Sequence, residues 1–144
     1  MTIYFDSSAL LKIYINEEYS DFIRQSVSKN QLNFISTLSY VEIHSAFSRL
    51  VNDNQISEEE LTFLKVSFNK DFKIFQKISI DNKILKRAAE LTYLTNLRTL
   101  DSIHLATIEH LKFTSDEEIM FACFDNKLIE GAITLGIKIL KPPL

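Results

Sequence analysis

The chain opens with MTIYFDSSALLKIY, residues 1–14. Thr2–Phe5 is a run of β-branched and aromatic residues, which is typical of a strand. Asp6 and two serines follow, and Ala9–Tyr14 then has the composition of a helix. A strand that passes directly into a helix places Asp6 at the carboxyl edge of a sheet, where open α/β folds bind their ligands. We therefore expect Thr2–Phe5 to be a central strand and Asp6 to face a site.

The overall composition indicates one globular domain spanning residues 1–144, with 46% hydrophobic and 24% charged residues. The net charge of −3 argues against a surface that coats nucleic acid, although it allows a local basic groove. No apolar run is long enough to span a membrane, and no signal peptide is apparent. The single cysteine, Cys123, excludes an intrachain disulfide. We therefore expect a reducing, cytoplasmic setting.

Strands and helices are expected to alternate along the rest of the chain. The further expected strands are Leu32–Ile35, Phe72–Ile80, Ile119–Phe124 and Ile137–Leu140. The helices between them are expected to begin near Asn16, Ser39, Ser57, Asp81, Thr99 and Asp125. Ser39, Ser57 and Asp81 are the expected N-caps, and Ser57 also forms a capping box with Glu60. This alternation predicts a three-layer α/β/α sandwich around a largely parallel five-stranded sheet.

Four acids stand where strands end or helices begin. Asp6 and Asp125 each follow an apolar strand, Glu42 borders the apolar stripe of a helix, and Asp101 opens an almost wholly apolar helix. Because parallel strands end at the same edge of a sheet, all four carboxylates are expected to converge there. Other interpretations remain open: Asp6 and Asp125 as helix caps, Asp101 as a favourable charge at a helix N-terminus, and Glu42 as a solvated residue or the partner of Arg49.

Four carboxylates at one edge repel one another unless a cation lies between them. Oxygen ligands without a cysteine or histidine cluster favour magnesium or manganese over zinc. A divalent cation in such a pocket suits phosphodiester hydrolysis, because it lowers the pKa of a bound water, orients that water and stabilises the leaving oxygen. The acids therefore predict a metal-dependent hydrolase of phosphodiester bonds.

The segments around the four acids are YFDSSALLKIY, SYVEIHSAFSRL, LRTLDSIHLATIEHL and FACFDNKL. In this order and spacing, they resemble a PIN-domain ribonuclease, of the kind that serves as the toxin in VapBC-type toxin–antitoxin pairs. The resemblance implies that Asp6, Glu42, Asp101 and Asp125 are the catalytic, metal-binding acids of an endoribonuclease that uses Mg²⁺ or Mn²⁺. It also implies that a metal-activated water cleaves the RNA, leaving 5′-phosphate and 3′-hydroxyl ends.

The same resemblance implies a homodimer and a cognate VapB-type antitoxin whose tail covers the acidic pocket. Ser7 or Ser8 is expected to add a hydroxyl or backbone contact to the site. Family members often carry Thr or Ser two residues before the last acid, where this chain has Cys123. One helix side is a candidate for part of a dimer interface, with burial inside the monomer as the equal alternative. Its residues are Leu61, Leu64 and Phe68.

Other residues and other folds offer alternatives to this interpretation. We interpret His104, three residues after Asp101, as a structural histidine that is hydrogen-bonded locally. A haloacid-dehalogenase-like enzyme requires a second acid at the position of Ser8, so the sequence argues against that class. A response-regulator receiver requires an acid pair after the first strand, and this chain lacks that pair. The remaining alternative is a catalytically inactive PIN-like module that binds RNA or acts in assembly.

Overall fold

The computed structural model describes residues 1–29 and 32–143. Its strands are β1 (Thr2–Phe5), β2 (Leu32–Ser36), β3 (Gln76–Ile78), β4 (Ile119–Ala122) and β5 (Lys138–Ile139). Its helices are α1 (Ser7–Tyr14), α2 (Ser20–Lys29), α3 (Ser39–Asn52), α4 (Glu58–Phe72), α5 (Asn82–Thr95), α6 (Thr99–Thr114) and α7 (Asn126–Thr134). No helix in these ranges is long and apolar enough to cross a membrane.

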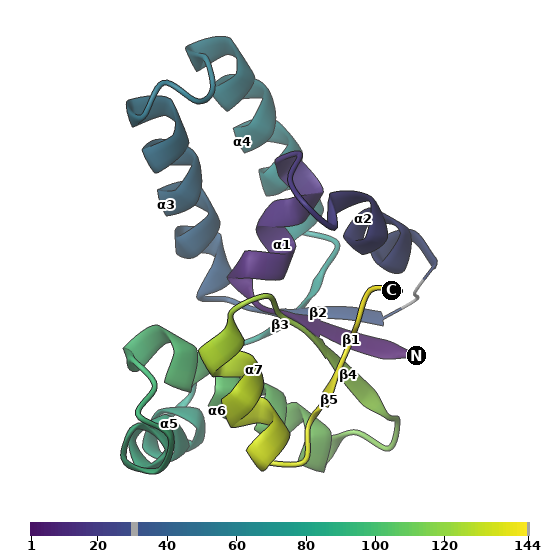
Figure 1. Cartoon of the computed structure of the whole chain (residues 1–144), viewed down its shortest axis with the longest axis vertical. Helices are drawn as coiled ribbons and strands as arrows, with labels where there is room; N and C mark the ends of the chain where they lie inside the picture. The colour runs from purple at the N-terminus through teal and green to yellow at the C-terminus, as the bar shows by residue number, and fades with distance from the viewer. Residues whose placement is uncertain (30–31, 144) are drawn as a thin grey trace.

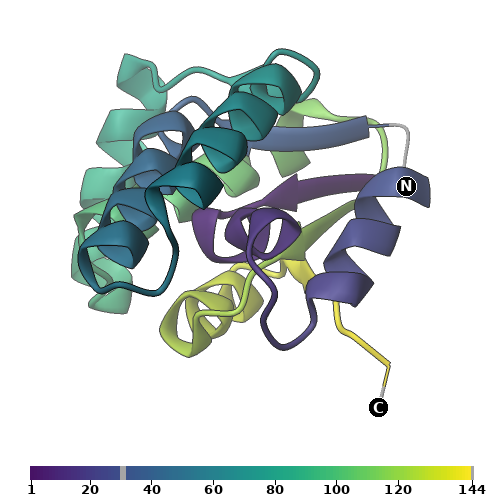
Figure 2. The same cartoon turned by 90° about the horizontal axis from the view of Figure 1, so that it is seen from above.

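The strands form one sheet in the order β3-β2-β1-β4-β5, and every neighbouring pair is parallel. Helices α1 to α4 cover one face of this sheet, and α5 to α7 cover the other (Figure 1; Figure 2). The predicted three-layer sandwich with a parallel five-stranded sheet is therefore confirmed, and β1 is its central strand, as expected. Because all the strands run in the same direction, their carboxyl ends lie along one edge.

Each face of the sheet has its own hydrophobic core. Side chains alternate between the faces along a strand, so that Ile3 and Phe5 pack against α1 to α4 whereas Tyr4 packs against α5 to α7. All three side chains are almost completely buried. The alternation matters for the site, because it places the Tyr4 hydroxyl beneath α6 while Asp6 follows at the end of the same strand.

The expected strand at Phe72–Ile80 is shorter than predicted. Helix α4 continues to Phe72, whose ring packs against the rings of Tyr40 and Phe68, and only Gln76–Ile78 pairs with β2. The period-two pattern therefore arose from the last turn of a helix joined to a short strand. Strand β3 lies at the edge of the sheet, and short edge strands limit unwanted pairing with other chains.

Most of the expected helix caps are present. Asp81 caps α5, and Ser57 forms the predicted capping box at the start of α4. The prediction that Ser39 is an N-cap is wrong, because Ser39 is the first residue of α3 and no side chain caps that helix. The second helix begins at Ser20 rather than at Asn16. The Ser20 hydroxyl accepts a hydrogen bond from the Glu17 amide and donates one to the Ile15 carbonyl, which holds the preceding residues in a turn.

The helix side that was a candidate for a dimer interface belongs to the monomer core. Leu64 and Phe68 are buried beneath α4, and Leu61 packs against the same cluster. The apolar residues that α4 exposes are instead Phe63 and Val66, which are 70% and 65% exposed. Of the two alternatives for Leu61, Leu64 and Phe68, the structure therefore selects burial within the monomer.

Candidate active site

The four acids predicted from the sequence come from four different elements at the carboxyl edge of the sheet. Asp6 follows β1, and Asp125 follows the neighbouring strand β4. Glu42 lies in the first turn of α3, and Asp101 lies in the first turn of α6. The other three acids all raise the pKa of Asp101 electrostatically, so their carboxylates lie close enough to repel it. The structure therefore brings the four acids together at one edge.

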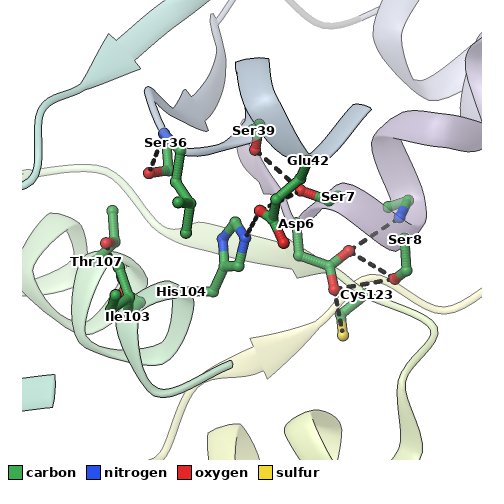
Figure 3. Close-up of polar contacts among 12 residues, drawn as sticks. Asp6, Ser7, Ser8, Ser36, Ser39, Glu42, Ile103, His104, Thr107 and Cys123 are labelled. Carbon is green, nitrogen blue, oxygen red and sulfur yellow. Dashed lines mark hydrogen bonds and ion pairs between the residues drawn. The ribbon is translucent and has the colours of Figure 1, made fainter. Parts of the chain in front are cut away.

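Asp6 is the most buried of the four and is only 4% exposed. Its Oδ1 accepts a hydrogen bond from the Ala9 amide at 2.9 Å, which caps α1, and the Ser8 hydroxyl bonds both carboxylate oxygens at 2.7 and 2.9 Å. The Cys123 thiol donates to Oδ2 at 3.1 Å (Figure 3). Burial raises the pKa of Asp6, against the charge of His104 and these hydrogen bonds, which lower it. Asp6 is thus a helix cap and a site residue at once.

Glu42 is held by hydrogen bonds from Ser7 and His104 and does not pair with Arg49, which was one of the alternatives. Its Oε1 accepts a hydrogen bond from Ser7 Oγ at 2.6 Å and lies 2.6 Å from His104 Nε2. Arg49 points elsewhere and donates to Ser45 Oγ at 3.0 Å. Burial pushes the pKa of Glu42 up, but the hydrogen bond and charge of His104 and the bond from Ser7 outweigh it, so the pKa falls below its ordinary value. Glu42 is therefore ionised at neutral pH.

Asp101 and Asp125 form the more open side of the site. Burial raises the pKa of Asp101, the charges of Asp125, Asp6 and Glu42 raise it further, and His104 partly offsets them. Asp125 is exposed and caps α7 by accepting the Leu128 amide at 3.0 Å. The interpretation of Asp125 as a helix cap is therefore also correct.

His104 is the residue whose role the sequence did not reveal. It is 2% exposed, and its hydrogen bonds reach other elements instead of its own helix: Nδ1 lies 2.8 Å from the Tyr4 hydroxyl, and Nε2 meets Glu42. Burial lowers the pKa of His104, but the hydrogen bond and charge of Glu42, with the charges of Asp6 and Asp101, raise it overall. The only hint in the sequence was its position one turn after Asp101.

The donor set matches the chemistry of a hard divalent cation, because all four acids offer oxygen and the other three raise the pKa of Asp101. Within residues 1–29 and 32–143, however, no three acidic, histidine or cysteine side chains converge tightly enough to form a closed metal site. Two acids are instead tied by hydrogen bonds, Asp6 to Ser8 and Glu42 to His104. In the described part of the chain, the four acids therefore form an open carboxylate edge rather than a closed ligand cage.

A groove lies directly beside this edge. It encloses about 360 Å³, and its lining includes Ser7, Ser8 and Glu42, apolar side chains of α1 and α3, and also Arg49 and Leu100. Its volume falls in the range of small-ligand pockets. A larger hollow of about 540 Å³, between the end of α1 and the start of α4, contains none of the four acids. The smaller groove is therefore the one relevant to chemistry at the carboxylate edge.

Comparison with curated proteins finds related ribonucleases. Ribonuclease VapC46 of Mycobacterium tuberculosis is 27% identical over 141 residues, which cover 97% of this chain and 97% of that protein. Ribonuclease VapC45 of the same species is 23% identical over 137 residues, covering 95% of this chain and 93% of that protein.

Solved structures share the fold at low sequence identity. FitAcB from Neisseria gonorrhoeae aligns with a TM-score of 0.73 at 11% identity and covers 97% of both chains. The Mycobacterium tuberculosis toxin VapC20, described as cleaving the sarcin–ricin loop, aligns with a TM-score of 0.70 at 10% identity, covering 98% of this chain and 100% of that one. The family model described as "PIN domain" matches residues 3–130. The chain therefore belongs to the PIN domain family.

Proposed function

We propose that this protein is a magnesium- or manganese-dependent endoribonuclease and the toxin of a type II toxin–antitoxin pair. The observation that carries the proposal is the gathering of Asp6, Glu42, Asp101 and Asp125 from four elements at one sheet edge, where the other acids raise the pKa of Asp101. Membership of the PIN domain family and relatives named ribonucleases support RNA as the substrate.

The four acids would hold the cation. When bound, a divalent cation lowers the pKa of a water and stabilises the charge that develops on the leaving oxygen. Asp6 contributes a carboxylate whose orientation is fixed by the Ala9 amide and the Ser8 hydroxyl. Glu42 contributes a carboxylate that stays ionised because of His104 and Ser7. Because these two carboxylates are already held in place, the site needs less reorganisation when charge develops in the reaction.

RNA would reach the acids along the groove lined by Ser7, Ser8 and Glu42. Arg49 in the lining of the groove can contact a phosphate, whereas the apolar side chains of the lining favour an unpaired base over a charged group. With a net charge of −3, the protein has little general attraction for nucleic acid, so local contacts of this kind would position the strand.

The proposed partner is a VapB-type antitoxin, and the proposed assembly is a homodimer. One structural neighbour is a toxin–antitoxin complex from Klebsiella pneumoniae. It aligns at 17% identity with a TM-score of 0.66, and the alignment covers 90% of this chain and 92% of that one.

Light scattering at micromolar concentration tests the proposed homodimer. A mass twice that of the 16.7 kDa chain is expected, and a monomeric mass would contradict the dimer.

The test of the proposed function is cleavage of an RNA oligonucleotide by the purified protein with EDTA, Mg²⁺ or Mn²⁺. Cleavage is expected only with metal and should leave 5′-phosphate and 3′-hydroxyl ends. The control is Asp53→Asn, which removes an exposed carboxylate at the far end of α3 from Glu42. RNA binding without cleavage under all three conditions would favour the inactive RNA-binding module instead.

A further inference from the structure

His104 links three elements of the fold through its two ring nitrogens. The ring belongs to α6, and its Nε2 lies 2.6 Å from Glu42 of α3 (Figure 3). Its Nδ1 lies 2.8 Å from the Tyr4 hydroxyl of β1. We propose that His104 is a positioning residue that holds the Glu42 carboxylate in the orientation in which it binds a divalent cation. This inference rests on the proposed function.

The geometry at Glu42 leaves one oxygen available. In the described part of the chain, both hydrogen bonds to this carboxylate, from Ser7 and from His104, are made at Oε1. Oε2 is therefore the oxygen that these two hydrogen bonds leave open to a ligand. A glutamate side chain has three rotatable bonds before its oxygens, so two donors converging on Oε1 restrict where Oε2 can point. Outer partners of this kind commonly orient metal-binding side chains.

The position of the proton on His104 follows from its partner. An ionised carboxylate has only acceptors, so Nε2 must carry the hydrogen that it shares with Glu42. The other nitrogen, Nδ1, is engaged by the Tyr4 hydroxyl, which is 0% exposed and fixed in the central strand. The hydrogen bond with Tyr4 therefore fixes the orientation of the His104 ring, and the ring in turn fixes the position of Glu42 Oε1.

Two near-isosteric substitutions separate positioning from mere packing. In His104→Gln, the side-chain amide reaches the place of Nε2 and can still donate to Glu42. In His104→Asn, the amide reaches only the place of Nδ1, so it keeps Tyr4 as a partner and leaves Glu42 without its donor. Both variants lose the same ring from the same buried site. A difference between them therefore reports the contact with Glu42 rather than the loss of packing.

The experiment titrates metal-free protein with Mn²⁺ alone and follows binding by electron paramagnetic resonance. For His104→Asn, the dissociation constant is expected to rise by about 10-fold or more, and for His104→Gln by clearly less. Ile108→Val is the matched control, because Ile108 is buried on the same helix and packs in the core beneath α6. This control should bind Mn²⁺ like the wild type, even where its melting temperature is lower.

A second readout uses the wild-type protein and needs no folded variant. The chain has three histidines, and a ¹⁵N spectrum of their rings should show one that carries a proton on Nε2 in both charge states and whose signal moves when Mg²⁺ is added. Equal Mn²⁺ affinities for His104→Asn and His104→Gln, or a His104 signal indifferent to Mg²⁺ that the protein binds, would overturn the positioning role alone. Wild-type protein that binds no Mn²⁺ would overturn the proposed function and the positioning role together.

Discussion

Cys123 donates its thiol hydrogen to Asp6 Oδ2 across 3.1 Å, joining the ends of the neighbouring strands β4 and β1. The Asp6 amide also donates to the Ala122 carbonyl at 3.1 Å, so backbone and side chain link the same two strand ends. Burial, followed by the charge and hydrogen bond of Asp6, raises the pKa of the Cys123 thiol far above its ordinary value. The thiol is therefore a structural donor to the carboxylate and not a nucleophile.

The first prediction concerns the reactivity of this thiol. Because Cys123 is 2% exposed and its pKa is raised, it should resist a disulfide reagent such as DTNB at about pH 8 in the native state. In denaturant, one thiol per chain should react at the rate of a free cysteine. Rapid native labelling at that pH would contradict both the burial and the bond to Asp6.

The second prediction concerns the repulsion at the acidic edge. Burial and the charge of Asp125 raise the folded-state pKa of Asp101 above 3.8. The contribution of this group to stability is therefore present below about pH 3.8 and is lost as the pH rises through the raised pKa. At neutral pH the ionised carboxylate destabilises the metal-free protein. We expect Asp101→Asn to raise the melting temperature of the metal-free protein by about 1–3 °C.

The same variant should respond less to metal. Mn²⁺ that binds only the folded state stabilises the wild type by mass action, by about 2.7 kcal/mol at 100 times the dissociation constant. Loss of one carboxylate should reduce that gain. Thermal scans with EDTA and with millimolar Mn²⁺ measure both effects. A metal-free Asp101→Asn protein that melts lower than the wild type, yet gains as much from Mn²⁺, would contradict the account.

The third prediction concerns the pair of His104 and Glu42. Glu42, Asp6 and Asp101 face His104 and raise its folded-state pKa above 6.5, against the effect of burial. Stability from this group is therefore complete below about pH 6.5 and is lost as the pH rises through the raised pKa. Because glutamine does not titrate, the melting temperature of the wild type should exceed that of His104→Gln most below about pH 6.5.

The measurement is the difference in melting temperature between the wild type and His104→Gln from about pH 5 to about pH 9, in EDTA. The difference should shrink at the alkaline end. A difference that stays constant over this range would show that His104 has the same pKa in the folded and unfolded states, which would contradict the raised pKa.

The parts of the molecule that were predictable from the sequence are those with a local signal. Thr2–Phe5 and Asp6 were identified because the strand, the acid and the helix that it caps are contiguous in the chain. The pairing of His104 with Tyr4 and Glu42 was not predictable, because these residues are 100 and 62 positions away in the chain. Only the alternation of faces along β1 and the register of the helices bring them together.

The strand predicted at Phe72–Ile80 is too long because the local pattern in this segment is ambiguous. A short stretch of alternating apolar residues fits a strand, but it also fits the end of an amphipathic helix followed by an edge strand. Tertiary contacts decided between the two, because the Phe72 ring completes an aromatic cluster with Tyr40 and Phe68. No pattern within the segment itself contains that information.

The fourth prediction concerns catalysis by the buried acid Asp6 and by Asp101. Asparagine preserves the shape of each side chain and one oxygen ligand, but it removes the charge that attracts a cation. The loss of such an electrostatic contact costs on the order of 10²-fold or more in rate. Glu42→Gln should be nearly as severe, because its free oxygen lies at the same edge.

The most direct test is the single-turnover rate of RNA cleavage in saturating Mn²⁺ by the wild type, Asp6→Asn, Asp101→Asn and the exposed-acid control Asp53→Asn. We predict that the first two variants lose on the order of 10²-fold or more while their far-UV circular dichroism is unchanged, and that Asp53→Asn cleaves like the wild type. Cleavage by folded Asp6→Asn and Asp101→Asn at the wild-type rate would contradict the account of a nuclease that works through these four acids.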